Sequence, residues 1–205
     1  MPSKKELCQN WKVYVITSPG PRPLEWMVEE AIAGGASVVQ FRDKTSRDPE
    51  FFQQAEKILA VTRKHHIPLI INDRIQATKE LGAEGVHLGQ DDASLAEARR
   101  ILGEAAIVGR STHSPEQALA AQKEGFDYIG VGPVFQTPTK PTYQPVGLDL
   151  VRFAAKNIQI PFVAIGGIEE GNVKQVRDAG AKTVAVVRAI MGSATPRQIT
   201  RKLVG

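Results

Sequence analysis

Short apolar runs rich in branched side chains alternate along this chain with stretches in which apolar residues recur every three or four positions. The first pattern is typical of buried β-strands, and the second of amphipathic helices packed on a sheet. The runs predict eight strands, at Lys12–Thr17, Ser37–Phe41, Pro68–Asn72, Gly85–Leu88, Ile107–Gly109, Tyr128–Val131, Phe162–Ile165 and Thr183–Val187. The amphipathic stretches predict helices at Trp26–Ala33, Glu50–His65, Leu95–Leu102, Pro115–Glu124, Leu148–Asn157 and Asn172–Ala179.

Strands that alternate with helices indicate βα units and a parallel sheet. Glycines follow several helices just before the next strand, where they supply a left-handed helix stop, as at Gly34, Gly82, Gly125 and Gly180. An open, doubly wound sheet is the competing architecture, but no Gly-x-Gly-x-x-Gly follows the first strand. We therefore predict an α/β fold, a single-domain, eight-stranded parallel TIM (β/α)8 barrel over residues 1–205.

The composition indicates the cellular compartment in which we expect this protein. The 205 residues are 42% apolar and 23% charged, and the single cysteine, Cys8, excludes an intrachain disulfide and suits a reducing compartment. No run approaches the roughly 20 apolar residues of a membrane span. The N-terminus around Lys4 and Lys5 lacks the apolar core of a secretory signal. We expect a cytoplasmic protein with no membrane partner, whose first ten residues are dispensable, as untied termini usually are.

The net charge of +4 and the pI near 9.2 raise the question of nucleic-acid binding. The basic residues are scattered, and no basic stretch is interleaved with aromatic residues, so we expect no nucleic-acid partner. A solvated surface with a modest cationic excess explains the charge. Cations near a site also raise the local concentration of an anionic small-molecule substrate.

Aspartates follow two consecutive predicted strands. Asp73 comes directly after the third strand, and Asp91 and Asp92 come shortly after the fourth. Adjacent strand ends lie about 5 Å apart, so two carboxylates can reach one hard cation from neighbouring loops. Magnesium commonly takes one or two protein carboxylates and leaves its other positions to water and substrate phosphates. The alternative is that the aspartates cap the helices that follow. Spacing alone does not choose between Asp91 and Asp92.

Two cations and a carboxamide leave the second predicted strand. Gln40, Arg42 and Lys44 are two residues apart and share one face of an extended segment, so they can point into the barrel mouth. Charges there need a partner, which a metal-bridged diphosphate would supply. Ion pairing with Asp43 or Glu84 is the alternative interpretation.

Further anion-binding groups follow the later strands. The longest irregular stretch, residues 132–147, has the composition of a lid that carries an anion ligand. A solvated loop, which is also polar, is the alternative interpretation. The candidate substrate-binding residues on this loop are Thr137, Pro138, Thr139 and Lys140. Ser111 and its neighbours either cap the helix at Pro115 or face an anion. His87 lies in a buried strand and is interpreted as a hydrogen-bonded wall histidine rather than a general base.

A glycine pair provides a separate phosphate site. Gly166 and Gly167 follow the seventh strand, and Val187 ends the predicted eighth strand, with Arg188 directly after it. Loops at these two positions of such barrels often bind phosphate through backbone N–H groups, and glycine lets the phosphate approach closely. The residues therefore predict a site with two ends, one for a metal and a diphosphate and the other for a monophosphate.

Six motifs, in order and at compatible spacing, resemble those of the thiamine-phosphate synthase (thiamine-phosphate pyrophosphorylase) family over nearly the whole chain. They are Val39-Gln40-Phe41-Arg42-Asp43-Lys44, Ile71-Asn72-Asp73, Val86-His87-Leu88-Gly89-Gln90-Asp91-Asp92, Gly109-Arg110-Ser111-Thr112-His113, Gly132-Pro133-Val134-Phe135-Gln136-Thr137-Pro138-Thr139-Lys140 and Ile165-Gly166-Gly167-Ile168. The resemblance implies a transferase that joins hydroxymethylpyrimidine diphosphate to thiazole phosphate, giving thiamine phosphate and pyrophosphate.

The same resemblance implies a role for each matching residue. The pyrimidine diphosphate ligands would be Gln40, Arg42, Lys44, Asn72, Ser111 and Lys140, of which Arg42, Lys44, Ser111 and Lys140 are the implied catalytic groups. The ligands of the cofactor Mg²⁺ would be Asp73 and Asp92, so the resemblance favours Asp92 over Asp91. The thiazole phosphate would lie against Thr137, Pro138, Thr139, Gly167, Val187 and Arg188.

Two other functions compete with this one. A related thiazole tautomerase would share the barrel and the thiazole phosphate end, but it would not need the complete diphosphate end that this chain carries. A non-catalytic, ligand-binding paralogue would be favoured by the loss of a metal or diphosphate residue, and none is lost. We expect phosphorylated small molecules as partners, and the sequence is compatible with a homo-oligomer.

Overall fold

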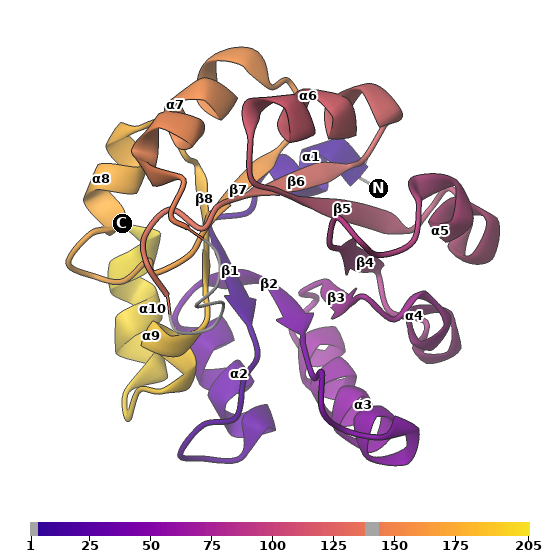
Figure 1. Cartoon of the computed structure of the whole chain (residues 1–205). Helices are drawn as coiled ribbons and strands as arrows, with labels where there is room; N and C mark the ends of the chain where they lie inside the picture. Colours follow the sequence, from indigo (N-terminus) through magenta and orange to yellow (C-terminus); the bar gives the residue numbers. More distant parts are fainter. Residues whose placement is uncertain (1–3, 138–143) are drawn as a thin grey trace.

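The eight strands close into a parallel barrel, as the sequence predicts. The structure is a computed structural model that describes residues 4–137 and 144–205. Each strand pairs with the next along the chain, and β8 pairs with β1, so the order around the barrel is the order in sequence (Figure 1). The strands are β1 (Val13–Ile16), β2 (Ala36–Phe41), β3 (Leu69–Asn72), β4 (Gly85–Leu88), β5 (Ile107–Thr112), β6 (Tyr128–Val131), β7 (Phe162–Ile165) and β8 (Thr183–Val186).

Most helices form a ring outside the barrel (Figure 1). They are α2 (Leu24–Ala33), α3 (Asp48–Lys64), α4 (Ile75–Leu81), α5 (Leu95–Leu102), α6 (Pro115–Glu124), α7 (Gly147–Asn157), α8 (Val173–Asp178), α9 (Arg188–Met191) and α10 (Pro196–Val204). The apolar periodicity located α5 and α6 to the residue and missed α4, α9 and α10. Two of those three helices have only seven and four residues, too few for a repeated apolar face. No described helix is long and apolar enough to cross a membrane.

Strand alternation explains how the barrel presents both a core and a site. Side chains two residues apart share a face, so the buried interior positions Val38 and Ile70 lead directly to Gln40 and Asn72 at the carboxyl ends of their strands. The opposite faces pack against the helices. Below the polar positions, the interior is filled by an apolar cluster that includes Tyr14, Val38, Ile70, Ile107, Tyr128 and Val163. The site therefore rests on a packed core.

The amino end of the barrel is covered by one further helix, α1 (Lys4–Gln9). Cys8 of this helix is 1% exposed and packs with Trp11 into the interior cluster. Lys4 Nζ lies 3.1 Å from Asp127 Oδ1, and Arg99 Nη2 lies 2.7 Å from Asp127 Oδ2, just before β6. The N-terminal segment is thus tied to the barrel by burial and by charge, and the expectation of an untied terminus is wrong.

Candidate active site

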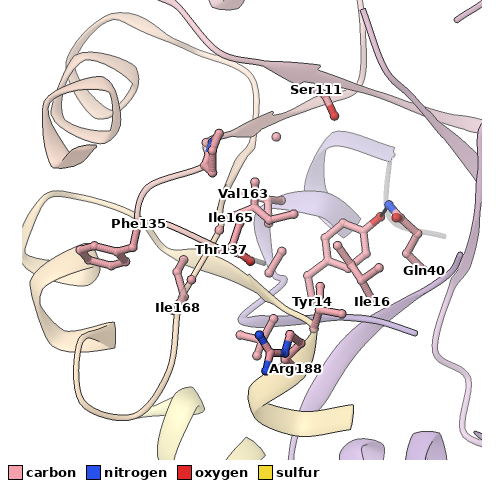
Figure 2. A pocket seen from close by; sticks show the side chains of 18 of the residues that line it. Tyr14, Ile16, Gln40, Ser111, Phe135, Thr137, Val163, Ile165, Ile168 and Arg188 are labelled. Carbon is pink, nitrogen blue, oxygen red and sulfur yellow. Dashed lines mark hydrogen bonds between the residues drawn. The ribbon is translucent and has the colours of Figure 1, made fainter. Parts of the chain in front are cut away.

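A cavity of about 710 Å³ opens at the carboxyl end of the barrel. Interior side chains of the strands form its floor, and the loops after β6, β7 and β8 contribute one wall. In the view of Figure 2, Ser111 and Arg188 lie on opposite sides of the pocket, with Val163 and Ile165 between them. The pocket therefore has a polar side beside β2 to β5 and a glycine-containing side beside β7 and β8.

A chain of hydrogen bonds crosses the floor of this cavity. Gln40 Nε2 donates to the Tyr14 hydroxyl at 2.9 Å (Figure 2), and the hydroxyls of Tyr14 and Tyr128 are 2.8 Å apart. The Tyr128 hydroxyl lies 2.9 Å from His87 Nδ1, and His87 Nε2 lies 2.9 Å from Ser111 Oγ. Two predicted substrate ligands, Gln40 and Ser111, are thus held by one network. His87 is a hydrogen-bonded wall histidine, as predicted.

The two tyrosines in this network are kept neutral by burial. Tyr14 is 2% and Tyr128 0% exposed, and desolvation raises the pKa of both phenols. The Tyr128 ring fits because Gly109 lies opposite it, where a Cβ would be 2.1 Å from the ring. A small residue at one strand position thus makes room for the central member of the network.

The carboxyl groups of Asp73 and Asp92 meet at the mouth, next to Asn72. The two groups interact directly. Asp73 Oδ2 also lies 3.1 Å from Lys44 Nζ, and Asp92 Oδ2 accepts the Gly89 N–H at 2.6 Å. Burial, followed by the neighbouring Asp92, raises the pKa of Asp73 against the charge of Lys44. Burial also disfavours ionised Asp92, but its pKa is lowered because the Gly89 N–H and the other contacts outweigh that effect. A positive charge placed between two such carboxyl groups would favour the ionised form of both.

Neither aspartate serves as a helix cap. The residue before α4 is Arg74, and the residue before α5 is Ser94, whose side chain accepts the Glu97 N–H. Asp73 has a φ of 62°, in the left-handed region that few residues other than glycine adopt. The helix-capping alternative is therefore wrong for both residues, and Asp92 rather than its neighbour approaches Asp73.

The cations after β2 divide between the cavity and the carboxylates. Arg42 lines the cavity, whereas Lys44, with a side chain 53% exposed, pairs with Asp73 at its edge. The alternative partners are engaged elsewhere. Asp43 accepts hydrogen bonds within its own turn, and Glu84 accepts one from the backbone of β3. The two cations therefore remain at the mouth, one facing the pocket and one facing the acids.

The loop after β7 is built around two glycines in positive-φ conformations. Gly166 has a φ of 107° and Gly167 a φ of 64°. A Cβ on Gly166 would lie 2.5 Å from Pro133 Cα, and one on Gly167 would lie 2.8 Å from the Gln136 carbonyl oxygen. Both glycines line the cavity, so only a residue without a side chain allows this close packing at the cavity wall.

Several predicted residues complete the glycine-containing side. Thr137, Val187 and Arg188 line the cavity, and Arg188 is exposed to solvent at its rim. Val187 directly precedes α9 rather than ending β8. Three other predicted residues lie outside the described part of the chain: Pro138, Thr139 and Lys140.

Strand β5 is longer than the sequence indicated. It extends to Thr112, so Ser111 is a strand residue whose Oγ faces the interior, and not a loop hydroxyl. The helix-capping role falls to Ser114, which accepts the Gln117 N–H at 3.3 Å. The helix-capping alternative therefore holds for Ser114 and not for Ser111.

Sequence reasoning missed several residues that line the site. Tyr14 and Tyr128 fall within predicted strands but were not selected; a buried phenol, which needs a hydrogen-bond partner, was the available signal. Asn172 and Glu169 line the cavity from the loop after Gly167, and the pattern of apolar positions gave no reason to select them.

Known proteins are similar to this chain in sequence and in fold. Residues 13–190 match the model of the family described as thiamine monophosphate synthase. The chain belongs to the thiamine monophosphate synthase family. A thiamine-phosphate synthase of Thermus thermophilus is 45% identical over 200 residues, covering 94% of this chain and 95% of that protein. A solved structure of thiamine phosphate pyrophosphorylase from Pyrococcus furiosus superposes with a TM-score of 0.87 at 34% identity, covering 96% of this chain and 95% of its own.

Some members of the thiamine monophosphate synthase family are longer. The thiamine-phosphate synthase of a Synechocystis strain is 44% identical over 195 residues, which is 95% of this chain and 57% of that protein. The chain spans little more than half the length of such cyanobacterial relatives.

Proposed function

We propose that this protein condenses 4-amino-2-methyl-5-(diphosphomethyl)pyrimidine with 4-methyl-5-(2-phosphoethyl)thiazole, or its carboxylated form, to give thiamine phosphate and pyrophosphate, with carbon dioxide as a further product from the carboxylated form. The observation that carries the proposal is a single cavity with two chemically different ends. Arg42 lines one end, next to the edge where Lys44 pairs with Asp73, and the glycine loop forms the other end together with Arg188. Two phosphorylated substrates that must react with each other would each bind at one end of this cavity.

The pyrimidine diphosphate would occupy the polar end. Gln40 and Asn72 offer carboxamides from the ends of β2 and β3 to the aminopyrimidine. Arg42, Lys44 and Lys140 would neutralise the diphosphate, and Ser111 would donate to it from β5. Because His87 and the tyrosines fix Gln40 and Ser111 before any ligand arrives, binding there costs little reorganisation.

The acids at the mouth fit a magnesium ion. No group of three or more His, Cys, Asp or Glu side chains suitable for a metal occurs in residues 4–137 and 144–205, so the protein offers two carboxylates, Asp73 and Asp92. Two carboxylates, with water and phosphate oxygens elsewhere, match the usual ligand set of this ion. Asp73 and Asp92 would hold Mg²⁺, which supplies positive charge to the diphosphate when bound.

The protein's main task in this reaction is electrostatic. The bond from the pyrimidine methylene carbon to the diphosphate oxygen breaks, its electron pair leaves with pyrophosphate, and the ring stabilises the resulting methylene cation. The thiazole nitrogen then donates its electron pair to that carbon. Arg42, Lys44 and Lys140 would stabilise the leaving group, an effect that is often the largest catalytic contribution. No protein base is required, which agrees with the structural position of His87.

The thiazole phosphate would occupy the other end. Its phosphate would sit on the Gly167 backbone, with Val187 and Arg188 at the start of α9. Thr137, Pro138 and Thr139 would lie against the thiazole. Val163 and Ile165 provide apolar wall between the ends of the cavity, which suits two stacked heterocycles that must exclude water.

The experiment that tests this function mixes the purified protein with both substrates and Mg²⁺ and measures thiamine phosphate and pyrophosphate by chromatography. We expect both products in equal amounts from the complete mixture, and neither when a substrate or the metal ion is omitted. A folded protein that binds thiazole phosphate but forms no product from the complete mixture would contradict the proposal and favour the tautomerase or the non-catalytic paralogue.

A further inference from the structure

Asn172 directly precedes α8 but does not cap it. Asparagine is a favoured residue at this position because its side chain can accept a backbone N–H of the first turn. Here the side chain makes no such bond. Instead Asn172 Nδ2 donates to the Gly167 carbonyl at 2.8 Å, and Asn172 Oδ1 accepts the Glu169 N–H at 2.9 Å. The side chain thus turns back onto the loop that carries the glycine pair.

The glycine loop is held from its other side by the chain after β6. The Val134 N–H donates to the Ile165 carbonyl at 2.8 Å, and the Phe135 N–H donates to the Gly166 carbonyl at 3.0 Å. The second bond fixes the peptide group that precedes Gly167, which carries the Gly167 N–H. Asn172 fixes the peptide group that follows it. Gly167 therefore has both of its flanking peptide groups anchored.

Such anchoring matters because glycine is otherwise free to rotate. Gly167 holds a φ of 64°, one of several conformations that a glycine adopts at similar cost. A backbone N–H binds an anion well only when its direction is set in advance. The Gly167 carbonyl has Asn172 as the side-chain partner that sets the following peptide, and Asn172 itself lines the same cavity.

We propose that Asn172 is a positioning residue that sets the Gly167 backbone for the phosphate of the thiazole substrate. The inference rests on the proposed function for the identity of that phosphate. Asparagine suits the task because its side chain donates and accepts at once. Aspartate could still accept the Glu169 N–H, but it would face the Gly167 carbonyl with an oxygen and add negative charge beside the phosphate.

The test compares Asn172→Ala and Asn172→Asp with wild type and with Lys174→Ala. Lys174 lies two residues further on, on α8; its side chain is 84% exposed and pairs with Asp178 on the surface. We expect KM for thiazole phosphate to rise about tenfold in Asn172→Ala, the scale of losing such hydrogen bonds. KM for the pyrimidine diphosphate should change less than about twofold, and Lys174→Ala should match wild type.

Asn172→Asp separates positioning from helix capping. Aspartate caps helices as well as asparagine does, so a capping role predicts wild-type kinetics for this variant. Positioning predicts a KM for thiazole phosphate at least as high as that of Asn172→Ala. Wild-type values in Asn172→Asp, or an equal rise of both KM values in Asn172→Ala, would overturn the inference.

Inorganic phosphate binding, measured by calorimetry, keeps this test separate from the proposed function. Phosphate should bind Asn172→Ala and Asn172→Asp about tenfold more weakly than wild type and Lys174→Ala. Synthase activity absent from every protein would defeat the proposed function and leave this comparison decisive. Equal phosphate affinities, or no phosphate binding to wild type, would overturn the role of Asn172.

Discussion

The same eight strands form both ends of the barrel, but the amino end is closed by a helix and the carboxyl end opens into a cavity. At the amino end, Cys8 of α1 and Trp11, just after this helix, pack on the apolar interior, and Asp127 pairs with Lys4 and Arg99. At the carboxyl end, the interior opens into a cavity, two acids face each other, and Asp73 has a positive φ. The amino end is closed by packing and ion pairs within the chain, and the carboxyl end is open to solvent.

This difference suggests that the amino end contributes mainly to the stability of the fold and the carboxyl end mainly to its chemistry. The carboxyl end keeps like charges together and holds Asp73 in a left-handed conformation, both of which cost stability. The packed amino end and the barrel interior offset that cost. Changes at the carboxyl end should therefore alter kinetics with little loss of stability, and changes at the amino end should do the reverse.

The largest effect is expected at the acidic pair. Asp92→Ala should lower turnover at least about 100-fold, the scale of losing a principal electrostatic contact. Its melting temperature should change little, because the loss of the Gly89 N–H contact is offset by relief of the contact with Asp73. Asp91→Ala, which removes the exposed neighbouring carboxylate, is the matched control and should retain wild-type turnover. Steady-state rates and thermal melts of both variants test this, and a fully active Asp92→Ala would contradict the carboxyl-end assignment.

Removal of residues 1–9 tests the opposite end. Loss of the buried face of α1 should cost about 2 kcal/mol of unfolding free energy, which lowers the melting temperature by roughly 4–8 °C. Both KM values should remain within about twofold of wild type at temperatures where the truncated protein is folded. An unchanged melting temperature combined with lost activity would reverse the proposed division between the ends.

Tyr128→Phe probes the network that lies between the two ends. The variant removes the hydroxyl that joins Tyr14 to His87 and leaves those buried groups without that partner. We expect kcat/KM for the pyrimidine diphosphate to fall about tenfold and the melting temperature to drop as well. KM for thiazole phosphate should be nearly unchanged. If the two substrates were affected equally, the network would not belong to the pyrimidine side.

Alkaline pH gives the smallest expected effect. Burial, followed by the charge of Asp127, raises the pKa of the Cys8 thiol from 9.0 to about 12. Because the folded-state pKa is the higher one, this contribution to stability is complete below pH 9 and is lost as the pH rises towards 12. In urea titrations between pH 9 and pH 10, wild type should lose about 1 kcal/mol more unfolding free energy than Cys8→Ala. Parallel slopes would show that the thiol is not held neutral in the folded protein.

Most of the barrel could be predicted from sequence because a parallel barrel reads as short apolar strands separated by amphipathic helices. The predicted strand ends at Gly85, Leu88, Tyr128 and Val131 coincide with the observed ones. Strand β5 was predicted too short because Arg110 and Ser111 interrupt its apolar run, although both continue the ladder with β6. The covering helix α1 was missed because six residues give little periodicity, and only the folded barrel supplies the surface against which Cys8 is buried.

The site was predictable wherever chemistry-bearing residues follow strands directly. Strand order alone brought Asp73 and Asp92 together, and alternation placed Gln40 and Asn72 on the interior. The network through Tyr128 and the loop contact of Asn172 depend on side-chain directions, which composition and spacing do not encode. For the same reason the sequence could not decide whether each aspartate was a helix cap.

A crystal structure with Mg²⁺, pyrophosphate and thiazole phosphate tests most directly whether one mouth serves both substrates. We expect a metal ion about 2.1 Å from carboxylate oxygens of both Asp73 and Asp92, and we expect pyrophosphate to bind to this metal ion. We also expect the thiazole phosphate on the Gly167 backbone in the same cavity. A metal ion bound elsewhere, or the two phosphorylated ligands in separate cavities, would contradict the account.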